Sequence, residues 1–287
     1  KLNTLFVLRN KKQARGLLPV IPKKRMGQHF LIDEHAIERI VAALELGSED
    51  LLVEIGPGMG ALTGHLLPRY GTRLHCVEVD REAIAYLEAH YPSLVGQLHR
   101  ADCLRFDYAT LPAERLVFVG NLPYNISSQI LFLLVALRKR VPSAVFMLQR
   151  EVAYRLAAKK GTKENGILSI LVQCYFDVEL LFDLPPEAFN PPPKVHSSVV
   201  RLTRNQRKEL PCDVALFERI VKGTFGQRRK MLRNSIESTL GIRIDALPQA
   251  TLRPEALDIE DFILLTQELS DRIDVQDATN RSALSQE

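Results

Sequence analysis

The sequence predicts an α/β fold with a doubly wound, mainly parallel sheet, followed by a small all-helical domain. Up to about residue 165, strand-like apolar runs alternate with amphipathic helical segments, as in repeated βαβ units. Two long β-rich runs, 167–181 and 195–202, then follow one another, which indicates a terminal antiparallel pair of strands. From about residue 205 onward, apolar residues recur at helical spacing.

The first strand and the loop after it, residues 51–60, form the central motif of the chain. An apolar run contains Glu54 near its end, and glycines follow at positions 56, 58 and 60 before a helical segment. Glycine lacks a Cβ, so a ligand can lie against the backbone of such a loop. The spacing differs from the G-x-G-x-x-G fingerprint, and Glu54 would repel a pyrophosphate but attract a sulfonium. The loop therefore favours S-adenosylmethionine over NAD.

Acids stand at the ends of the next two predicted strands. The run 73–80 ends in Glu78 and Asp80, about 20 residues after the loop, where an acid can accept both ribose hydroxyls. We assign this role to Glu78, and we expect Asp80 to cap the helix that follows. The short third strand ends at Asp102, which could accept a hydrogen bond from an adenine amino group. Both acids would face the ligand edge of the sheet, where the carboxyl ends of parallel strands meet.

The fourth strand, 116–119, leads into the segment Asn121-Leu122-Pro123-Tyr124. This segment suits methylation of an exocyclic amine such as adenine N6, whose lone pair is delocalised into the ring. The Asn121 side-chain oxygen and the Leu122 carbonyl would accept the two amine protons, and Tyr124 would stack on the base. An ordinary strand-to-helix turn is the alternative, because Asn and Pro are common turn residues.

The remaining elements complete the predicted organisation. The sheet domain should also contain helices at 61–67, 81–90, 129–137 and 151–158 and strands at 97–101 and 144–148. We expect four regions: a basic N-terminal arm (1–25), the sheet domain (26–204), a helical domain (205–273) and a disordered tail (274–287).

Composition restricts the class of protein. The net charge of +4 is modest, but cationic residues form short runs, which suit nucleic acid or a solvated surface. The four cysteines form no C-x-x-C pair, so we expect reduced thiols in a cytoplasmic protein, without a zinc site or disulfides. No apolar run reaches the length of a membrane span, and no signal peptide is indicated.

Six motifs, in this order, resemble those of the ribosomal RNA adenine N6,N6-dimethyltransferases: Gly27-Gln28-His29-Phe30-Leu31, Glu54-Ile55-Gly56-Pro57-Gly58-Met59-Gly60, Val77-Glu78-Val79-Asp80, Asn121-Leu122-Pro123-Tyr124-Asn125, Phe189-Asn190-Pro191-Pro192-Pro193-Lys194-Val195 and Phe225-Gly226-Gln227-Arg228-Arg229-Lys230. The resemblance implies a class I methyltransferase fold that uses S-adenosylmethionine and no metal. The implied substrate is two adjacent adenosines in the 3′-terminal hairpin of small-subunit (16S) rRNA. An immature 30S subunit would be the partner of a monomeric enzyme that acts in ribosome biogenesis.

The resemblance also assigns roles to individual residues. The implied cofactor contacts are His29, Leu31, Gly56, Glu78, Asp102 and Asn121. The amine would be held by Asn121, Leu122 and Tyr124, and Phe189, expected to be exposed after a proline pair, would cover the second face of the base. A basic helical face would grip RNA phosphates, and the RNA-binding set is Lys194, Lys222, Arg228, Arg229, Lys230 and Arg233. Family members usually have Asn at the position of His29, which can still donate one hydrogen bond.

Two other functions share parts of the pattern. The large-subunit rRNA methyltransferases that confer macrolide resistance have the same glycine loop and the same core around Asn121 to Tyr124. The proline-rich segment 190–194 and the C-terminal pattern favour a small-subunit substrate. A factor for ribosome assembly or mitochondrial transcription could keep the fold without turnover, but Glu78, Asp102 and the segment 121–124 are all intact.

Overall fold

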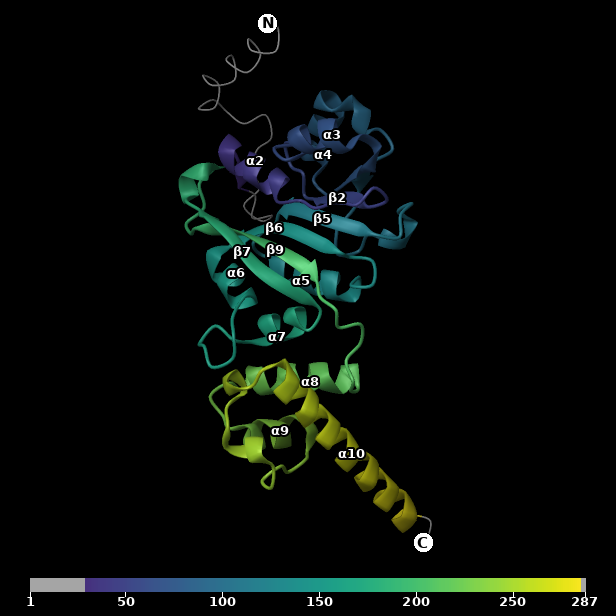
Figure 1. The fold of residues 1–287 in the computed structure, drawn as a ribbon, viewed down its shortest axis with the longest axis vertical. Coiled ribbons are helices and arrows are strands. Elements are labelled where there is room, and N and C mark those ends of the chain that lie inside the picture. Colours follow the sequence, from purple (N-terminus) through teal and green to yellow (C-terminus); the bar gives the residue numbers. More distant parts are fainter. Residues whose placement is uncertain (1–28, 285–287) are drawn as a thin grey trace, which may run out of the picture.

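A mixed seven-stranded sheet forms the centre of the computed structural model, which describes residues 29–284, with side chains through residue 273 (Figure 1). The strand order is β4-β3-β2-β5-β6-β9-β7. The strands are β2 (Leu51–Ile55), β3 (Leu74–Glu78), β4 (Leu98–Arg100), β5 (Leu116–Asn121), β6 (Ser143–Gln149), β7 (Phe176–Leu184) and β9 (Ser197–Arg204). The strands from β4 to β6 are parallel, and β9 runs antiparallel to both β6 and β7. The predicted doubly wound sheet with a terminal antiparallel pair is thereby confirmed.

Helices cover both faces of the sheet (Figure 1). One face carries α2 (Glu34–Ala42), α3 (Thr63–Tyr70) and α4 (Arg81–His90), and the other carries α5 (Ser127–Ala136), α6 (Arg150–Leu156) and α7 (Ile167–Gln173). Residues along β2 alternate between the two cores: Leu52 packs with the first layer and Val53 with the second. Because both faces are covered, the central strands read as continuous apolar runs.

Short elements complete the sheet domain and the C-terminal part. The 3-10 turns are η2 (Gly71–Arg73), η3 (Pro92–Leu94), η4 (Tyr108–Thr110), η5 (Pro186–Ala188), η6 (Pro248–Thr251) and η7 (Pro254–Ala256). A separate antiparallel pair joins β1 (Phe30–Leu31) to β8 (Phe189–Asn190). This pair brings the N-terminal segment of the domain against the proline-rich loop.

Aspartate side chains begin several helices. Asp80 precedes α4 and accepts a hydrogen bond from the amide of Glu82, so its predicted role as an N-cap is confirmed. Asp33 and Asp213 cap α2 and the first helix of the C-terminal domain in the same way. These caps satisfy amides that have no partner within the helix.

The predicted β-rich run 167–181 is wrong in its first half, because Ile167–Gln173 form the helix α7. Ile167, Ile170, Leu171 and Cys174 recur at helical spacing, so their apolar side chains share one face. That face packs against neighbouring helices, and Ile170 and Leu171 are buried in the larger core. The β-branched residues of this segment suit a strand as well as a helix, and packing against neighbouring helices makes it helical.

Three helices follow the sheet domain: α8 (Val214–Gly226), α9 (Leu232–Leu240) and α10 (Ile259–Leu284). Phe217 and Phe262 meet edge to face in their core, with ring centroids 6.5 Å apart. Residues 274–284 of the predicted tail continue α10 away from the rest of the molecule (Figure 1). This segment is polar but contains no Gly or Pro to end a helix. The predicted N-terminal arm, 1–25, lies outside the described residues.

Candidate active site

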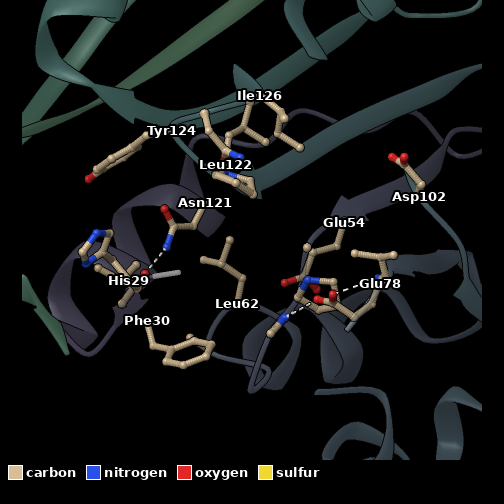
Figure 2. Close-up of a pocket in the computed structure, with 18 of the residues that line it drawn as sticks. His29, Phe30, Glu54, Leu62, Glu78, Asp102, Asn121, Leu122, Tyr124 and Ile126 are labelled. Atoms are coloured by element: carbon tan, nitrogen blue, oxygen red, sulfur yellow. Dashed lines mark hydrogen bonds between the residues drawn. The ribbon is translucent and has the colours of Figure 1, made fainter. Parts of the chain in front are cut away.

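A cavity of about 260 Å³ lies at the carboxyl edge of the parallel strands (Figure 2). It is lined by the glycine loop, by the ends of β3 and β5, by the loop after β4 and by the segment from His29 to Leu31. The cavity lies at the switch point of the sheet, where the strand order reverses. From β2 the chain continues to β3 and β4 on one side, whereas β5 pairs with the other side of β2. Ligands of open α/β sheets bind in this place.

The glycine loop requires glycine for both its conformation and its packing. Gly56, Gly58 and Gly60 all have positive φ, at 64°, 58° and 81°. A Cβ on Gly60 would lie 2.5 Å from an atom of the Tyr91 ring, so a side chain has no room there. The loop therefore presents bare backbone to the cavity.

Glu78 lies at the end of β3 and ties this strand to the glycine loop (Figure 2). Its Oε2 accepts a hydrogen bond from the Gly58 amide at 3.1 Å, and its Oε1 accepts from the amides of Val79 and Asp80 at 2.8 Å. Burial raises the pKa of this carboxyl, and the three amide bonds oppose that effect. Since a carboxylate offers about four acceptor sites, these bonds leave capacity for a ligand hydroxyl.

Glu54 is the most deeply buried acid of the cavity, with 1% of its surface exposed. Its Oε2 accepts hydrogen bonds from the Thr63 hydroxyl at 2.7 Å and from the Cys76 thiol at 3.7 Å. Burial raises its pKa from 4.5 to about 7. A cation in the cavity would favour the ionised form. The sequence singled out Glu54 for its attraction to a sulfonium, but Glu54 was not among the assigned cofactor contacts.

The Glu54→Gln variant is expected to remove the contribution of Glu54 to the pH dependence of unfolding between pH 4.5 and pH 7. The folded pKa, about 7, exceeds the ordinary value of 4.5, so the native state holds a proton that the unfolded chain releases. This stabilisation is complete below pH 4.5 and is lost as the pH rises through 7; its size is on the order of 3 kcal/mol. Glutamine imitates the protonated acid at every pH. Urea unfolding at pH 5 and pH 7.5 measures the difference.

The exposed acid Glu49 supplies the matched control for that measurement. Glu49→Gln should keep the wild-type loss of stability between the two pH values. If Glu54→Gln also kept it, Glu54 would not be the titrating group.

One hydrogen bond of its amide nitrogen fixes the orientation of the Asn121 side chain. Its Nδ2 donates to the His29 carbonyl at 2.7 Å, which leaves Oδ1 as the free acceptor of the amide (Figure 2). Among the described residues, no donor bonds to this oxygen or to the Leu122 carbonyl. The Gly120 Cα lies so close to β2 that a Cβ would be 2.6 Å from the Ile55 carbonyl oxygen. The turn therefore lies against the glycine loop.

Tyr124 and His29 lie together at one side of the cavity, and Asp102 lies at the other (Figure 2). The rings of His29 and Tyr124 stack with centroids 5.6 Å apart. The Tyr124 hydroxyl hydrogen-bonds to the Ser197 hydroxyl at 2.6 Å, and the His29 Nδ1 donates to the Pro191 carbonyl at 2.8 Å. The His29 side chain thus positions the wall of the cavity, while its carbonyl holds Asn121.

The structure brings every residue assigned to cofactor binding to this one cavity. They are His29, Leu31, Gly56, Glu78, Asp102 and Asn121, and the predicted amine-holding residues Leu122 and Tyr124 join them. The sequence assignments missed several apolar side chains that also line it: Phe30, Leu62, Val79, Leu104 and Ile126. Each lies within two residues of an assigned residue or of the glycine loop, which was the signal available. In the described part of the chain, no group of three or more His, Cys, Asp or Glu side chains could hold a metal ion.

The predicted exposure of Phe189 is wrong. Its side chain is 2% exposed, does not line the cavity and packs in the core under α2. Pairing of β8 with β1 sets Phe189 opposite Leu31 and turns the ring inward. Phe30, on the same pair, is the aromatic residue whose ring reaches the cavity and the glycine loop (Figure 2).

The predicted basic helical face is also wrong as a single face. Lys222 lies on α8, Arg233 lies on α9, and residues 228–230 form the turn between these helices, because α8 ends at Gly226. The Arg228 Nε lies 3.7 Å from a Glu255 carboxylate oxygen, whereas Arg229 and Lys230 are exposed. Lys194, the other residue assigned to RNA, is exposed in the loop between β8 and β9.

Comparisons with known proteins agree with this arrangement. Residues 22–262 match the family model described as Ribosomal RNA adenine dimethylase. The chain is 47% identical over 249 residues to a Parabacteroides distasonis protein named Ribosomal RNA small subunit methyltransferase A, a match that covers 86% of this chain and 93% of that protein.

Two solved structures have the same fold. A dimethyladenosine transferase from Plasmodium falciparum superposes with a TM-score of 0.71 at 24% identity, over 85% of this chain and 98% of that one. The 23S rRNA methyltransferase ErmE superposes with a TM-score of 0.57 at 25% identity, over 83% of this chain and 99% of that one. The fold is therefore that of methyltransferases.

Proposed function

The chain belongs to the ribosomal RNA adenine dimethylase family and is an rRNA methyltransferase, and we propose that its cavity binds S-adenosylmethionine and presents adenine N6 to it. The substrate proposed is the pair of adjacent adenosines in the 3′-terminal hairpin of small-subunit (16S) rRNA. One observation carries the proposal: the glycine loop and the segment Asn121 to Tyr124 line the same cavity.

The cavity residues fit the proposed cofactor chemically. Glu54 offers a negative charge beside bare glycine backbone, which suits a sulfonium and an ammonium group. Glu78 and Asp102 offer acceptors at the far side for hydroxyl and amino groups, and Val79 and Leu104 offer apolar surface beside them. When bound, S-adenosylmethionine supplies an electrophilic methyl group on its sulfonium.

The turn after β5 would hold the nucleophile. Asn121 Oδ1 and the Leu122 carbonyl would accept the two protons of the adenine amine and fix its nitrogen toward the methyl donor. The bond from Asn121 to the His29 carbonyl keeps the amide oriented before substrate arrives, so little reorganisation is needed. Tyr124 would stack on the base, and this kind of contact contributes about 1–3 kcal/mol.

A small-subunit substrate is favoured over a large-subunit one. The 47% identity to a small-subunit enzyme extends over nearly the whole of that protein, whereas the identity to ErmE is 25%. A binding factor without turnover is disfavoured, because Glu78, Asp102 and Asn121 stand together at one cavity. We further propose that the enzyme is a monomer that acts in the cytoplasm on the immature 30S subunit. Among the described residues, no helix is long and apolar enough to span a membrane.

Incubation with labelled S-adenosylmethionine and unmethylated small subunits tests the function. We expect label in two adjacent adenosines of the 3′-terminal 16S hairpin, found by mapping the modified bases. Label in large-subunit rRNA would support the alternative substrate, and absence of label from both subunits would contradict an active enzyme.

Neutralising the exposed turn between α8 and α9 is expected to weaken RNA binding and to reduce its salt dependence. Arg229 and Lys230 are exposed, so the double variant Arg229→Gln/Lys230→Gln should lower the slope of log K against log salt by about 1–2. Filter binding of the rRNA hairpin at several salt concentrations measures the slope. Lys139→Gln, which removes an exposed lysine paired with Glu209, is the control and should leave the slope unchanged. An unchanged slope in the double variant would show that the turn is ordinary solvated surface and does not contact RNA phosphates.

A further inference from the structure

The Tyr124 ring, which would stack on the adenine, is held by a residue outside the cavity wall. Its hydroxyl oxygen lies 2.6 Å from the hydroxyl oxygen of Ser197, a residue 73 positions later in the chain. Ser197 is 0% exposed and is not among the residues that line the cavity. Its hydroxyl therefore meets the substrate site through the bond to Tyr124.

Ser197 provides a fixed point because of its place in the sheet. It is the first residue of β9, and it pairs with Gln149 of β6 on one side and with Leu184 of β7 on the other. Since β9 runs antiparallel to β6, this first residue lies at the edge where β5 and β6 end. Side chains carried by strands are positioned more precisely than those carried by loops.

Tyr124 needs such a fixed point, because it lies in the turn between β5 and α5. Its backbone carbonyl accepts a hydrogen bond from the Ser127 hydroxyl at 3.3 Å, but this contact leaves the side-chain torsions free. The His29 ring stacks on the Tyr124 ring with centroids 5.6 Å apart. The bond to Ser197 holds the opposite end of the side chain, at the hydroxyl. The ring is thereby oriented before a base arrives.

The two hydroxyls depend on each other. In the part of the chain whose side chains are described, neither has another hydrogen-bond partner. Burial raises the pKa of the Tyr124 phenol, so it is protonated at neutral pH, and either hydroxyl can donate to the other. Deletion of either hydroxyl removes the same bond.

We propose that Ser197 is a positioning residue for methyl transfer, which sets the orientation of the Tyr124 ring and so the place of the stacked adenine relative to the methyl donor. This inference rests on the proposed function and extends its site to β9. Transfer needs the amine nitrogen in line with the sulfonium methyl, and a misplacement of about 1 Å can cost about 100-fold in rate. Release of the ring should therefore lower the rate more than the affinity for RNA, which phosphate contacts mainly supply.

Kinetics of Ser197→Ala, Tyr124→Phe and the double variant on unmethylated small subunits test the inference. We expect kcat to fall about tenfold in each single variant, the weight of one hydrogen bond, and no further in the double variant. The KM for the subunits should change by less than about twofold. Equilibrium binding of labelled S-adenosylmethionine counts the folded molecules, so the rate per donor site separates positioning from stability.

The next residue of β9 supplies the matched control. Ser198 is also buried, but its hydroxyl bonds to the Asp183 carboxylate on β7. Ser198→Ala should lower stability in urea and keep the wild-type kcat. A wild-type kcat in Ser197→Ala or Tyr124→Phe, or losses that multiply in the double variant, would overturn the inference while the wild type still methylates. A wild-type enzyme that labels neither subunit would contradict the proposed function and, with it, this inference.

Discussion

The Asn121→Ala variant is expected to lose methyl transfer, with kcat reduced at least about 100-fold, the usual effect of removing one preorganised hydrogen-bonding group from a transition state. Alanine removes the Oδ1 acceptor that would hold the adenine amine. It also removes the 2.7 Å bond that ties the His29 carbonyl to the turn after β5. Binding of the rRNA hairpin should change little, because phosphate contacts from the basic residues supply most of its affinity.

Single-turnover methylation of unmethylated small subunits measures this effect, with filter binding of the rRNA beside it. Asn205→Ala is the matched control: its amide also donates to a backbone carbonyl, that of Gln173, but lies outside the cavity. Asn205→Ala should lower stability without lowering the rate. A wild-type rate for Asn121→Ala would remove Asn121 from the mechanism.

The Glu78→Gln variant is expected to bind S-adenosylmethionine on the order of 100-fold more weakly. Its carboxylate accepts from three backbone amides, including that of Gly58 in the glycine loop. The glutamine amide keeps one acceptor oxygen and turns an NH₂ toward a backbone donor. A hydrogen bond from a ribose hydroxyl to a charged carboxylate contributes about 1.5–3 kcal/mol, and losing its charge-assisted part corresponds to a weakening of that order.

Equilibrium binding of labelled S-adenosylmethionine measures the affinity of this variant. Glu114→Gln changes an exposed acid outside the cavity and should bind like the wild type. If Glu78→Gln kept full affinity, Glu78 would serve only to cap the strand end.

Features encoded in short segments were predictable from the sequence. The glycine loop, the acid at the end of β3 and the turn at Asn121 each combine a strand with residues that end it, and parallel strands bring such ends to one edge. The alternation of strands and helices likewise predicted a doubly wound, mainly parallel sheet. The residues predicted to bind the cofactor therefore meet at one cavity.

Features that depend on tertiary partners were not predictable in this way. Phe189 follows a proline pair and reads as part of an exposed loop, but its pairing with Leu31 buries it. The run from Ile167 to Gln173 suits a strand by composition and becomes a helix because neighbouring helices cover its apolar face. Residues 228–230 read as helical beside their basic neighbours, whereas α8 ends before them.

The pairing of β1 with β8 has a consequence for biosynthesis. The His29 side chain bonds to Pro191, a residue 162 positions later, and β8 completes the support for the segment that carries Phe30 and Leu31 to the cavity. A ribosome must therefore synthesise well past Pro191 before the nascent enzyme can complete this part of the cavity. A polypeptide that stops before Pro191 lacks the support of β8 for Phe30 and Leu31, so its cavity stays incomplete.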